Sequence, residues 1–257
     1  MSYVKLKKED GLAVLTINRK EALNALNHEL LYELQSVLTL LEKDRDTRVI
    51  IITGRGKAFI AGADIKKMRE MNYPSAKEYS KLGQTVLNRI ENSSLIVIAA
   101  VNGYAIGGGN ELALSCDIRL ASTKAKFSQP EVSLGITAGF GATQRLLRIV
   151  GEAKARELLL TGRTITAEEA YKIGLINLVV DDGELLKQAS RLALTILENG
   201  PLAVIKNKKA INHSLNLSLK DGLEIERELF AECFKTNDQK EGMTAFLEKR
   251  PPKFRGK

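Results

Sequence analysis

Alternating apolar and polar positions open the chain. Over residues 3–18, apolar side chains recur at about every second position on both sides of a Glu-Asp-Gly turn. This period of two is typical of strands with one buried face, and a glycine-containing turn lets the chain fold back on itself. The pattern predicts a β-hairpin at the N-terminus.

The following segments alternate between helical spacing and short apolar runs. Apolar residues recur every three to four positions over 28–44 and over 75–92, which predicts two amphipathic helices. Continuous apolar runs at 49–53 and 94–101 predict buried strands. A unit of strand, strand and helix thus repeats loosely, although the self-similarity is too faint to define a repeat array. The sequence therefore predicts an α/β fold.

Successive segments with helical spacing begin at residue 141, and the stretch from Pro201 onward is helical in pattern almost throughout. Glycine, a common helix stop, closes four successive segments. These segments are 141–151, 154–162, 166–174 and 183–200. Pro201 suits the first turn of the next helix, and the segment 222–249 is amphipathic. A helical C-terminal region is expected.

The composition is that of an ordinary globular protein. Of the 257 residues, 44% are apolar and 27% are charged, enough for a substantial core in one large domain or a domain with a small appendage. The N-terminal segment lacks the succession of basic, apolar and small-residue regions that makes up a secretory signal. No apolar run reaches membrane-spanning length. We therefore expect a cytoplasmic protein that does not act in a membrane.

Basic residues outnumber acidic residues by 39 to 31, a formal net charge of +8. Lysines and arginines are spread along the chain and are not interleaved with aromatic residues on one stripe, so nucleic acid is not expected as the primary ligand. The charge better suits a solvated surface whose cations steer a phosphorylated substrate.

Cysteine and histidine, which carry much nucleophilic and metal chemistry, are scarce. Cys116 and Cys233 lie in apolar helical segments, where buried reduced thiols are expected. His28 and His213 fit no metal-ligand spacing and stand beside no candidate nucleophile. Neither a metal site nor a hydrolytic triad is expected, and carboxylates remain as the available bases.

The most informative segment, 99–116, is an apolar strand that runs through three consecutive glycines into a helix. Backbone N–H groups at a helix start can hold an oxyanion, and glycines leave room for a ligand. Glu111 follows Gly108 by three residues, so its carboxylate should face the same space as the Gly108 N–H. A first-turn carboxylate is often only structural, because it complements the helix dipole. Here its neighbours look buried, which favours a catalytic role.

Two further segments supply matching groups. Glu131 follows Pro130 shortly before another glycine-rich turn, and Ala63 stands in an Ala-Gly-Ala-Asp sequence at a helix start, where its N–H is a second candidate anion donor. Two N–H donors and two glutamates suffice for proton transfer next to a carbonyl, without a metal or a redox cofactor. None of the glycine-rich segments has the spacing of a dinucleotide or P-loop site.

Four segments, taken in order, resemble the enoyl-CoA hydratase (crotonase) family. They are 19–26, 49–68, 99–116 and 127–146. The resemblance continues to 245–254 and so covers essentially the whole chain. It implies a crotonase-like spiral of β-β-α units over residues 1–195 and a helical trimerisation region over 196–257. The implied assembly is a homohexamer, a dimer of trimers.

The resemblance also implies an activity, the reversible hydration of a short-chain trans-2-enoyl-CoA such as crotonyl-CoA, in fatty-acid or butanoate metabolism. The thioester oxygen would lie between the N–H groups of Ala63 and Gly108, and Glu111 and Glu131 would share the proton transfers. Coenzyme A would enter as part of the substrate and not as a cofactor. The coenzyme contacts carried over from the family are Lys20, Ala22, Ala25, Ala61, Asp64, Ile65 and Lys249.

One loop departs from the usual family pattern. Ala138 stands where many relatives have proline, and Ala142 stands where they have glycine, so a change in pocket shape is expected. An enoyl-CoA isomerase, which needs only one carboxylate, and an acyl-CoA hydrolase are alternatives on the same fold. A crotonase-like protein that binds RNA is an alternative from another class. The segment 67–74 is expected to flank the acyl tunnel.

Overall fold

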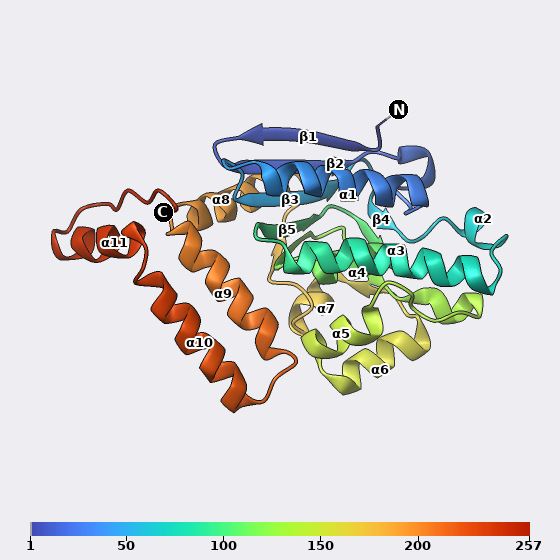
Figure 1. Cartoon of the computed structure of the whole chain (residues 1–257). Helices are drawn as coiled ribbons and strands as arrows, with labels where there is room; N and C mark the ends of the chain where they lie inside the picture. The colour runs from blue at the N-terminus through green and yellow to red at the C-terminus, as the bar shows by residue number, and fades with distance from the viewer. Residues whose placement is uncertain (1) are drawn as a thin grey trace.

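Within residues 2–257, which the computed structural model describes, the strands form two sheets (Figure 1). The first contains, in spatial order, β1 (Val4–Glu9), β2 (Leu12–Ile17), β3 (Val49–Gly54), β5 (Ile96–Val101), β7 (Ile118–Ser122) and β10 (Leu178–Val180). The second contains β4 (Ala58–Ala61), β6 (Tyr104–Ile106), β8 (Lys126–Ser128) and β9 (Ile165–Thr166). Neighbouring strands run parallel, except in the antiparallel pairs β1–β2 and β8–β9.

The helices cover and extend the sheets. In chain order they are α1 (His28–Lys43), α2 (Ile65–Met68), α3 (Tyr73–Asn92), α4 (Gly108–Ser115), α5 (Ala142–Val150), α6 (Glu152–Thr161), α7 (Ala167–Lys172), α8 (Leu185–Leu197), α9 (Pro201–Ser214), α10 (Leu219–Cys233) and α11 (Asn237–Leu247). The short 3-10 helices η1 (Lys20–Ala22) and η2 (Pro130–Leu134) lie in connections. Over residues 2–257, no helix combines the length and the apolar composition that a membrane span requires.

The chain passes repeatedly from the first sheet to the second and then into a helix. β3 leads to β4, α2 and α3; β5 leads to β6 and α4; β7 leads to β8, η2 and α5. Each turn adds one strand to each sheet, next to the strand of the previous turn. This arrangement confirms the predicted α/β fold with a spiral of β-β-α units.

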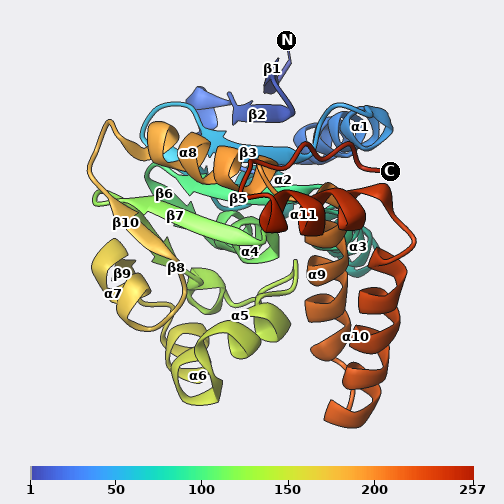
Figure 2. The ribbon, with the colours of Figure 1, turned by 90° about the vertical axis from the view of Figure 1, so that its left-hand side faces the viewer.

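Strand β3 illustrates why the centre of the first sheet is apolar on both faces. Ile50 and Ile52 join the larger core with residues of α1 and α3, whereas Val49 and Ile51 join a second cluster that includes α8. Because successive side chains of a strand point to opposite faces, a strand covered on both sides must be apolar throughout. Each such side chain contributes roughly 1.5–3 kcal/mol when fully buried. Figure 2 shows α8 lying across the first sheet.

The predictions for the first half of the chain are confirmed with one correction. The hairpin is β1–β2, the amphipathic helices are α1 and α3, and the apolar runs are β3 and β5. The single strand predicted from residue 99 into the glycines is wrong, because β5 ends at Val101 and the chain turns into β6 of the other sheet. Asn102 stabilises this turn, since its side chain accepts the Gly54 N–H at 2.9 Å and donates to Gly56 O at 3.0 Å.

In the second half, helices α5 to α8 end just before the expected glycines, and α9 begins at Pro201 as predicted. The segment 222–249 is divided between α10 and α11. The sequence did not predict the strands β9 and β10, which pair with β8 and β7. These strands are two and three residues long, and they form because the edges of sheets built earlier in the chain offer backbone partners.

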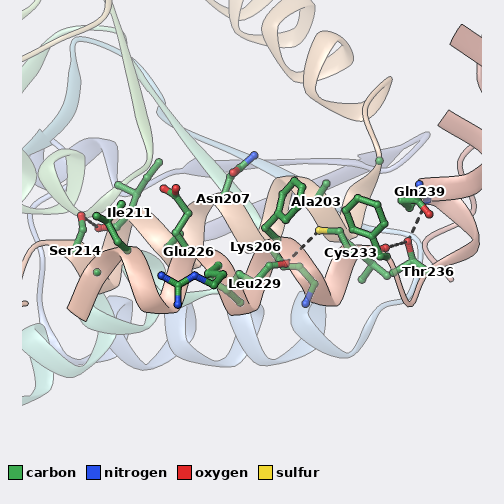
Figure 3. Close-up of a pocket in the computed structure, with 18 of the residues that line it drawn as sticks. Ala203, Lys206, Asn207, Ile211, Ser214, Glu226, Leu229, Cys233, Thr236 and Gln239 are labelled. Atoms are coloured by element: carbon green, nitrogen blue, oxygen red, sulfur yellow. Dashed lines mark hydrogen bonds between the residues drawn. The ribbon is translucent and has the colours of Figure 1, made fainter. Parts of the chain in front are cut away.

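Helices α9, α10 and α11 flank one side of the molecule (Figure 1). Lys208 attaches α9 to the core, where its Nζ donates to Asp117 Oδ2 at 2.8 Å and to Leu95 O at 2.9 Å. Residues of the three helices line a groove of about 1220 Å³, and Figure 3 shows Leu229 and Cys233 along it. The division of the chain after residue 195 falls within α8 and stays a prediction.

Candidate active site

Three parallel strands of the second sheet end at the same edge. Ala61, the last residue of β4, pairs with Ile106, the last residue of β6, and Ile106 pairs with Ser128, the last residue of β8. The loops that follow therefore start side by side, at the carboxyl ends of the strands, where α/β proteins bind ligands. These loops carry Ala63, the glycine-rich start of α4, and Glu131, which are far apart in the sequence.

A short β-bridge orients the backbone of Ala63. The Leu26 N–H donates to Gly62 O at 2.8 Å, and the Asp64 N–H donates to Leu26 O at 2.8 Å. Because the polar groups of an extended chain alternate in direction, the N–H of Ala63 faces away from Leu26. No residue among 2–257 accepts that N–H. Ala63 thus presents a backbone donor to the space beyond the bridge.

The first residue of α4 presents a second donor. Gly108 begins the helix, so its N–H belongs to the first turn, whose N–H groups have no acceptor within the helix. No hydrogen bond within residues 2–257 uses it. The dipole of α4 adds partial positive charge at this end of the helix. The two N–H groups come from different turns of the spiral and line the same cavity.

The glycines on either side of Gly108 have separate packing roles. Gly107 has a φ of +50°, and a Cβ there would lie 2.7 Å from Glu131 Oε1. A Cβ at Gly109 would lie 2.7 Å from the Ile60 carbonyl carbon and closer still to its oxygen. Gly107 therefore allows the Glu131 carboxylate to approach the turn, and Gly109 allows α4 to pack directly on β4.

Glu111 is only 2% exposed. Its Oε1 accepts the N–H of Phe140 at 2.8 Å and the N–H of Ala142 at 2.9 Å, while no hydrogen bond within residues 2–257 uses Oε2. Burial is the main cause that raises the pKa of Glu111 to about 7; the N–H groups oppose this shift, and the nearby charge of Glu131 adds to it. The carboxyl is therefore poised to exchange a proton near neutral pH, with one oxygen free for a ligand.

Glu131 lies on η2, directly after Pro130. Burial raises the pKa of its carboxyl as well. Its Oε2 is buried, and within residues 2–257 no group hydrogen bonds to it. A buried oxygen without a partner needs one from elsewhere, such as a ligand or a water molecule. Because the two glutamates influence each other, they are best treated as one coupled acid–base pair.

A cavity of about 610 Å³ joins these groups. Six residues predicted from the sequence line it: Ala61, Ala63, Ile65, Gly108, Glu111 and Glu131. Met68 and Met71, in the segment 67–74 that was expected to flank the acyl tunnel, also line it. The sequence did not indicate the rest of the apolar and aromatic wall, formed by Tyr79, Leu134, Ile136 and Phe140. Phe140 stands edge-on to Tyr79, with ring centroids 5.2 Å apart. A glycine inside a helical pattern was the available sign of this contact. Gly83 of α3 leaves room for the Phe140 ring, since a Cβ there would lie 2.6 Å from Phe140 Cγ.

The remaining predicted contacts lie outside this cavity. Lys20 and Ala22 are on η1, and Ala25 is buried next to the bridge at Leu26. Asp64 forms an ion pair with Arg19, with Nη2 and Oδ2 2.7 Å apart, which ties the segment 19–26 to the Ala63 loop.

Lys249 follows α11, which Figure 1 places on the opposite side of the molecule from α2. Its expected role at a phosphate therefore needs a second copy of the chain. Within residues 2–257 no group of three or more His, Cys, Asp or Glu side chains could hold a metal ion.

The site can polarise a carbonyl oxygen with two backbone donors and move protons beside it with two carboxyls. These features define an enzyme that acts on carbonyl or thioester compounds by acid–base chemistry. A model of the enoyl-CoA hydratase/isomerase family matches residues 7–257. The chain belongs to that family.

Individual relatives match this chain over nearly its full length. The chain is 50% identical over 251 residues to the short-chain-enoyl-CoA hydratase of Clostridium acetobutylicum, covering 97% of this chain and 96% of that protein. It is 50% identical over 250 residues to the crotonyl-CoA hydratase of Syntrophomonas wolfei, covering 97% of this chain and 96% of that protein. The crystal structure of an enoyl-CoA hydratase from Bacillus anthracis has a TM-score of 0.97 to this chain, with 39% identity and 100% of both chains covered.

Proposed function

We propose that this chain catalyses the reversible addition of water to short-chain trans-2-enoyl-CoA thioesters, with crotonyl-CoA as the model substrate. The observation that carries the proposal is the meeting of Glu111 and Glu131 with the N–H groups of Ala63 and Gly108 around one cavity. The names of the two relatives at 50% identity support both the reaction and the short acyl chain.

In this reaction the thioester oxygen accepts hydrogen bonds from the N–H groups of Ala63 and Gly108. Addition of water to C3 moves electron density through C2 onto that oxygen, and the two donors stabilise the enolate-like charge. Donors fixed by a β-bridge and a helix start need no reorientation as the charge develops. Loss of one such donor typically slows an enzyme by roughly a hundredfold or more.

The two glutamates divide the proton transfers. The carboxylate of Glu111 takes a proton from water through its free Oε2 while the water oxygen bonds to C3. The protonated carboxyl of Glu131 gives a proton to C2, so the net change is the addition of H and OH across the double bond. Burial raises the pKa of both carboxyls, and the repulsion between their charges favours one charged and one neutral carboxyl.

The coenzyme is part of the substrate, and the proposed reaction uses no metal or redox cofactor. Phosphates of coenzyme A suit a chain with a net charge of +8. We place the coenzyme along Lys20, Ala22 and Ala25. The bridge at Leu26 holds this segment next to the loop that contains Ala63.

The direct test is an assay of the purified chain with crotonyl-CoA. Loss of the absorbance of the conjugated thioester, together with formation of 3-hydroxybutyryl-CoA, is the expected result. A 3-enoyl-CoA supplied in parallel tests the isomerase alternative, and release of free thiol tests hydrolysis. Isomerisation or thiol release without hydration would contradict the proposal.

We further propose that six copies assemble as a dimer of trimers through the C-terminal helices. Apolar side chains line the groove between α9, α10 and α11 (Figure 3), and Phe246 on α11 is 83% exposed. Contiguous exposed apolar surfaces mark protein interfaces. Native mass spectrometry should give six times the 28.3 kDa chain mass, and Phe230→Glu in the groove should reduce it. A wild-type monomer would contradict the assembly, and with it the role of Lys249.

A further inference from the structure

The loop 138–142 has two sides with different partners. On one side, the N–H groups of Phe140 and Ala142 donate to Glu111 Oε1. On the other side, Gly139 O accepts from Ser80 Oγ at 2.6 Å and from Gln84 Nε2 at 2.9 Å. Both donors belong to α3, so the loop is held between α3 and the carboxylate.

A second carbonyl of the same loop is held by a buried arginine. Phe140 O accepts from Arg145 Nη1 at 3.1 Å. The remaining guanidinium donors are fixed by α3, since Nη2 lies 2.7 Å from Glu91 Oε2 and 2.6 Å from Asn88 Oδ1. The Arg145 side chain is only 9% exposed, so water does not compete freely for these contacts.

The geometry of the peptide bond connects the two sides. The C=O of Gly139 and the N–H of Phe140 belong to one planar trans unit and point in opposite directions. Holding the oxygen toward α3 therefore aims the N–H toward Glu111. The same relation connects Phe140 O, held by Arg145, with the N–H of Gly141, which also favours the charged Glu111. Hydrogen bonds at the oxygen polarise the unit and strengthen its N–H as a donor.

We propose that Ser80, Gln84 and Arg145 are positioning residues that fix these two peptide units and thereby stabilise the charged form of Glu111. This inference rests on the proposed function, because it gives Glu111 the role of the base. Glu131 on η2 and the hydroxyl of Tyr79 on α3 also influence Glu111. Neither supplies positive charge, whereas the backbone donors of the loop lower the pKa of Glu111 against the effect of burial.

The test compares pH profiles of kcat/KM for crotonyl-CoA between pH 5.5 and 9.5. In Ser80→Ala/Gln84→Ala and in Arg145→Lys, we expect the acidic limb to move to higher pH by about one unit. The rate at pH 6.5 should then fall about tenfold and return toward the wild-type rate at pH 9. Gln84→Ala alone, at an exposed position, should give a smaller shift in the same direction while keeping the fold.

Arg89→Lys is the matched control. Arg89 also lies on α3 and pairs with a glutamate, Glu42, at 2.6 Å, but it faces α1 and not the loop. The acidic limb of its pH profile of kcat/KM should stay at the wild-type pH. A loss in the Arg145 or Ser80/Gln84 variants that is equal at every pH would overturn the proposal, because it would indicate a structural role only. Unchanged profiles in all of them would overturn it as well.

A direct titration of Glu111 tests this proposal without relying on enzyme activity. In ligand-free protein with ¹³C-labelled glutamate carboxyls, the signal that is absent in Glu111→Gln reports on Glu111. Its midpoint should move to higher pH in the Arg145 and Ser80/Gln84 variants and stay in place in Arg89→Lys. An unmoved midpoint overturns the proposal even if the enzyme is an active hydratase. A protein without hydratase activity refutes the proposed function, while the midpoint still decides the positioning role.

Discussion

Glu111→Gln is expected to lower kcat for crotonyl-CoA hydration by a factor of about 10³ or more. Glutamine keeps the size of the side chain and its carbonyl oxygen can still accept the N–H groups of Phe140 and Ala142. It cannot take a proton from water, so the variant removes the base with little change in the surrounding structure. KM should change far less than kcat, because the coenzyme contacts are elsewhere.

Glu131→Gln should have an effect of similar size, because an amide cannot deliver a proton to C2. The double variant should be little slower than either single variant, since the pair acts as a unit. Glu152→Gln, at a side chain that is 67% exposed on α6, is the matched control and should retain wild-type turnover. Rates within tenfold of wild type in both single variants would refute the proposed mechanism.

The same Glu111 variant should be more stable than wild type above pH 7. The pKa of Glu111 rises from 4.5 to about 7 on folding, so between these pH values the folded chain holds a proton that the unfolded chain has released. The wild type therefore loses stability as pH rises through this range, by up to about 3 kcal/mol, and the glutamine variant does not. Urea unfolding at pH 5 and pH 8 measures this difference and also shows that lost activity is not lost folding.

Gly109→Ala is expected to destabilise the protein by about 3 kcal/mol or more. The added Cβ would lie 2.7 Å from the Ile60 carbonyl carbon and nearer to the oxygen, and these are backbone atoms of β4 that no rotamer change can move. Relief requires α4 to shift away from β4. Because β4 leads to Ala63 and α4 begins at Gly108, the shift separates the two N–H donors, and hydration should slow even where the variant remains folded.

Urea denaturation and the crotonyl-CoA assay together test the prediction for Gly109→Ala. Gly222→Ala on α10 is the control, because apart from its own helix backbone no atom of residues 2–257 lies within 4 Å of its added Cβ. It should raise stability by up to about 1 kcal/mol, as alanine favours a helix over glycine. Wild-type stability and activity in Gly109→Ala would show that the close approach of α4 to β4 is not required.

Local patterns predicted most elements of the fold, because hydrophobic periodicity is a local property. The hairpin, α1, α3, β3 and β5 followed from spacing alone. The strands β6, β9 and β10 did not, because each is short and exists only as a partner for a distant strand. The transfer of the chain between sheets at Asn102 likewise depends on backbone groups of residues 54–56.

The sequence by itself determined which residues could do chemistry: two glutamates, two donor loops beside glycines, and almost no histidine or cysteine. It could not determine that Ala63 turns its N–H away from Leu26, that Phe140 and Ala142 donate to Glu111, or that Arg145 holds the loop from behind. Those features decide how the carboxyls titrate, and they arise from contacts between segments far apart in the chain. Residue types are encoded locally, whereas direction, burial and pKa are properties of the packed structure.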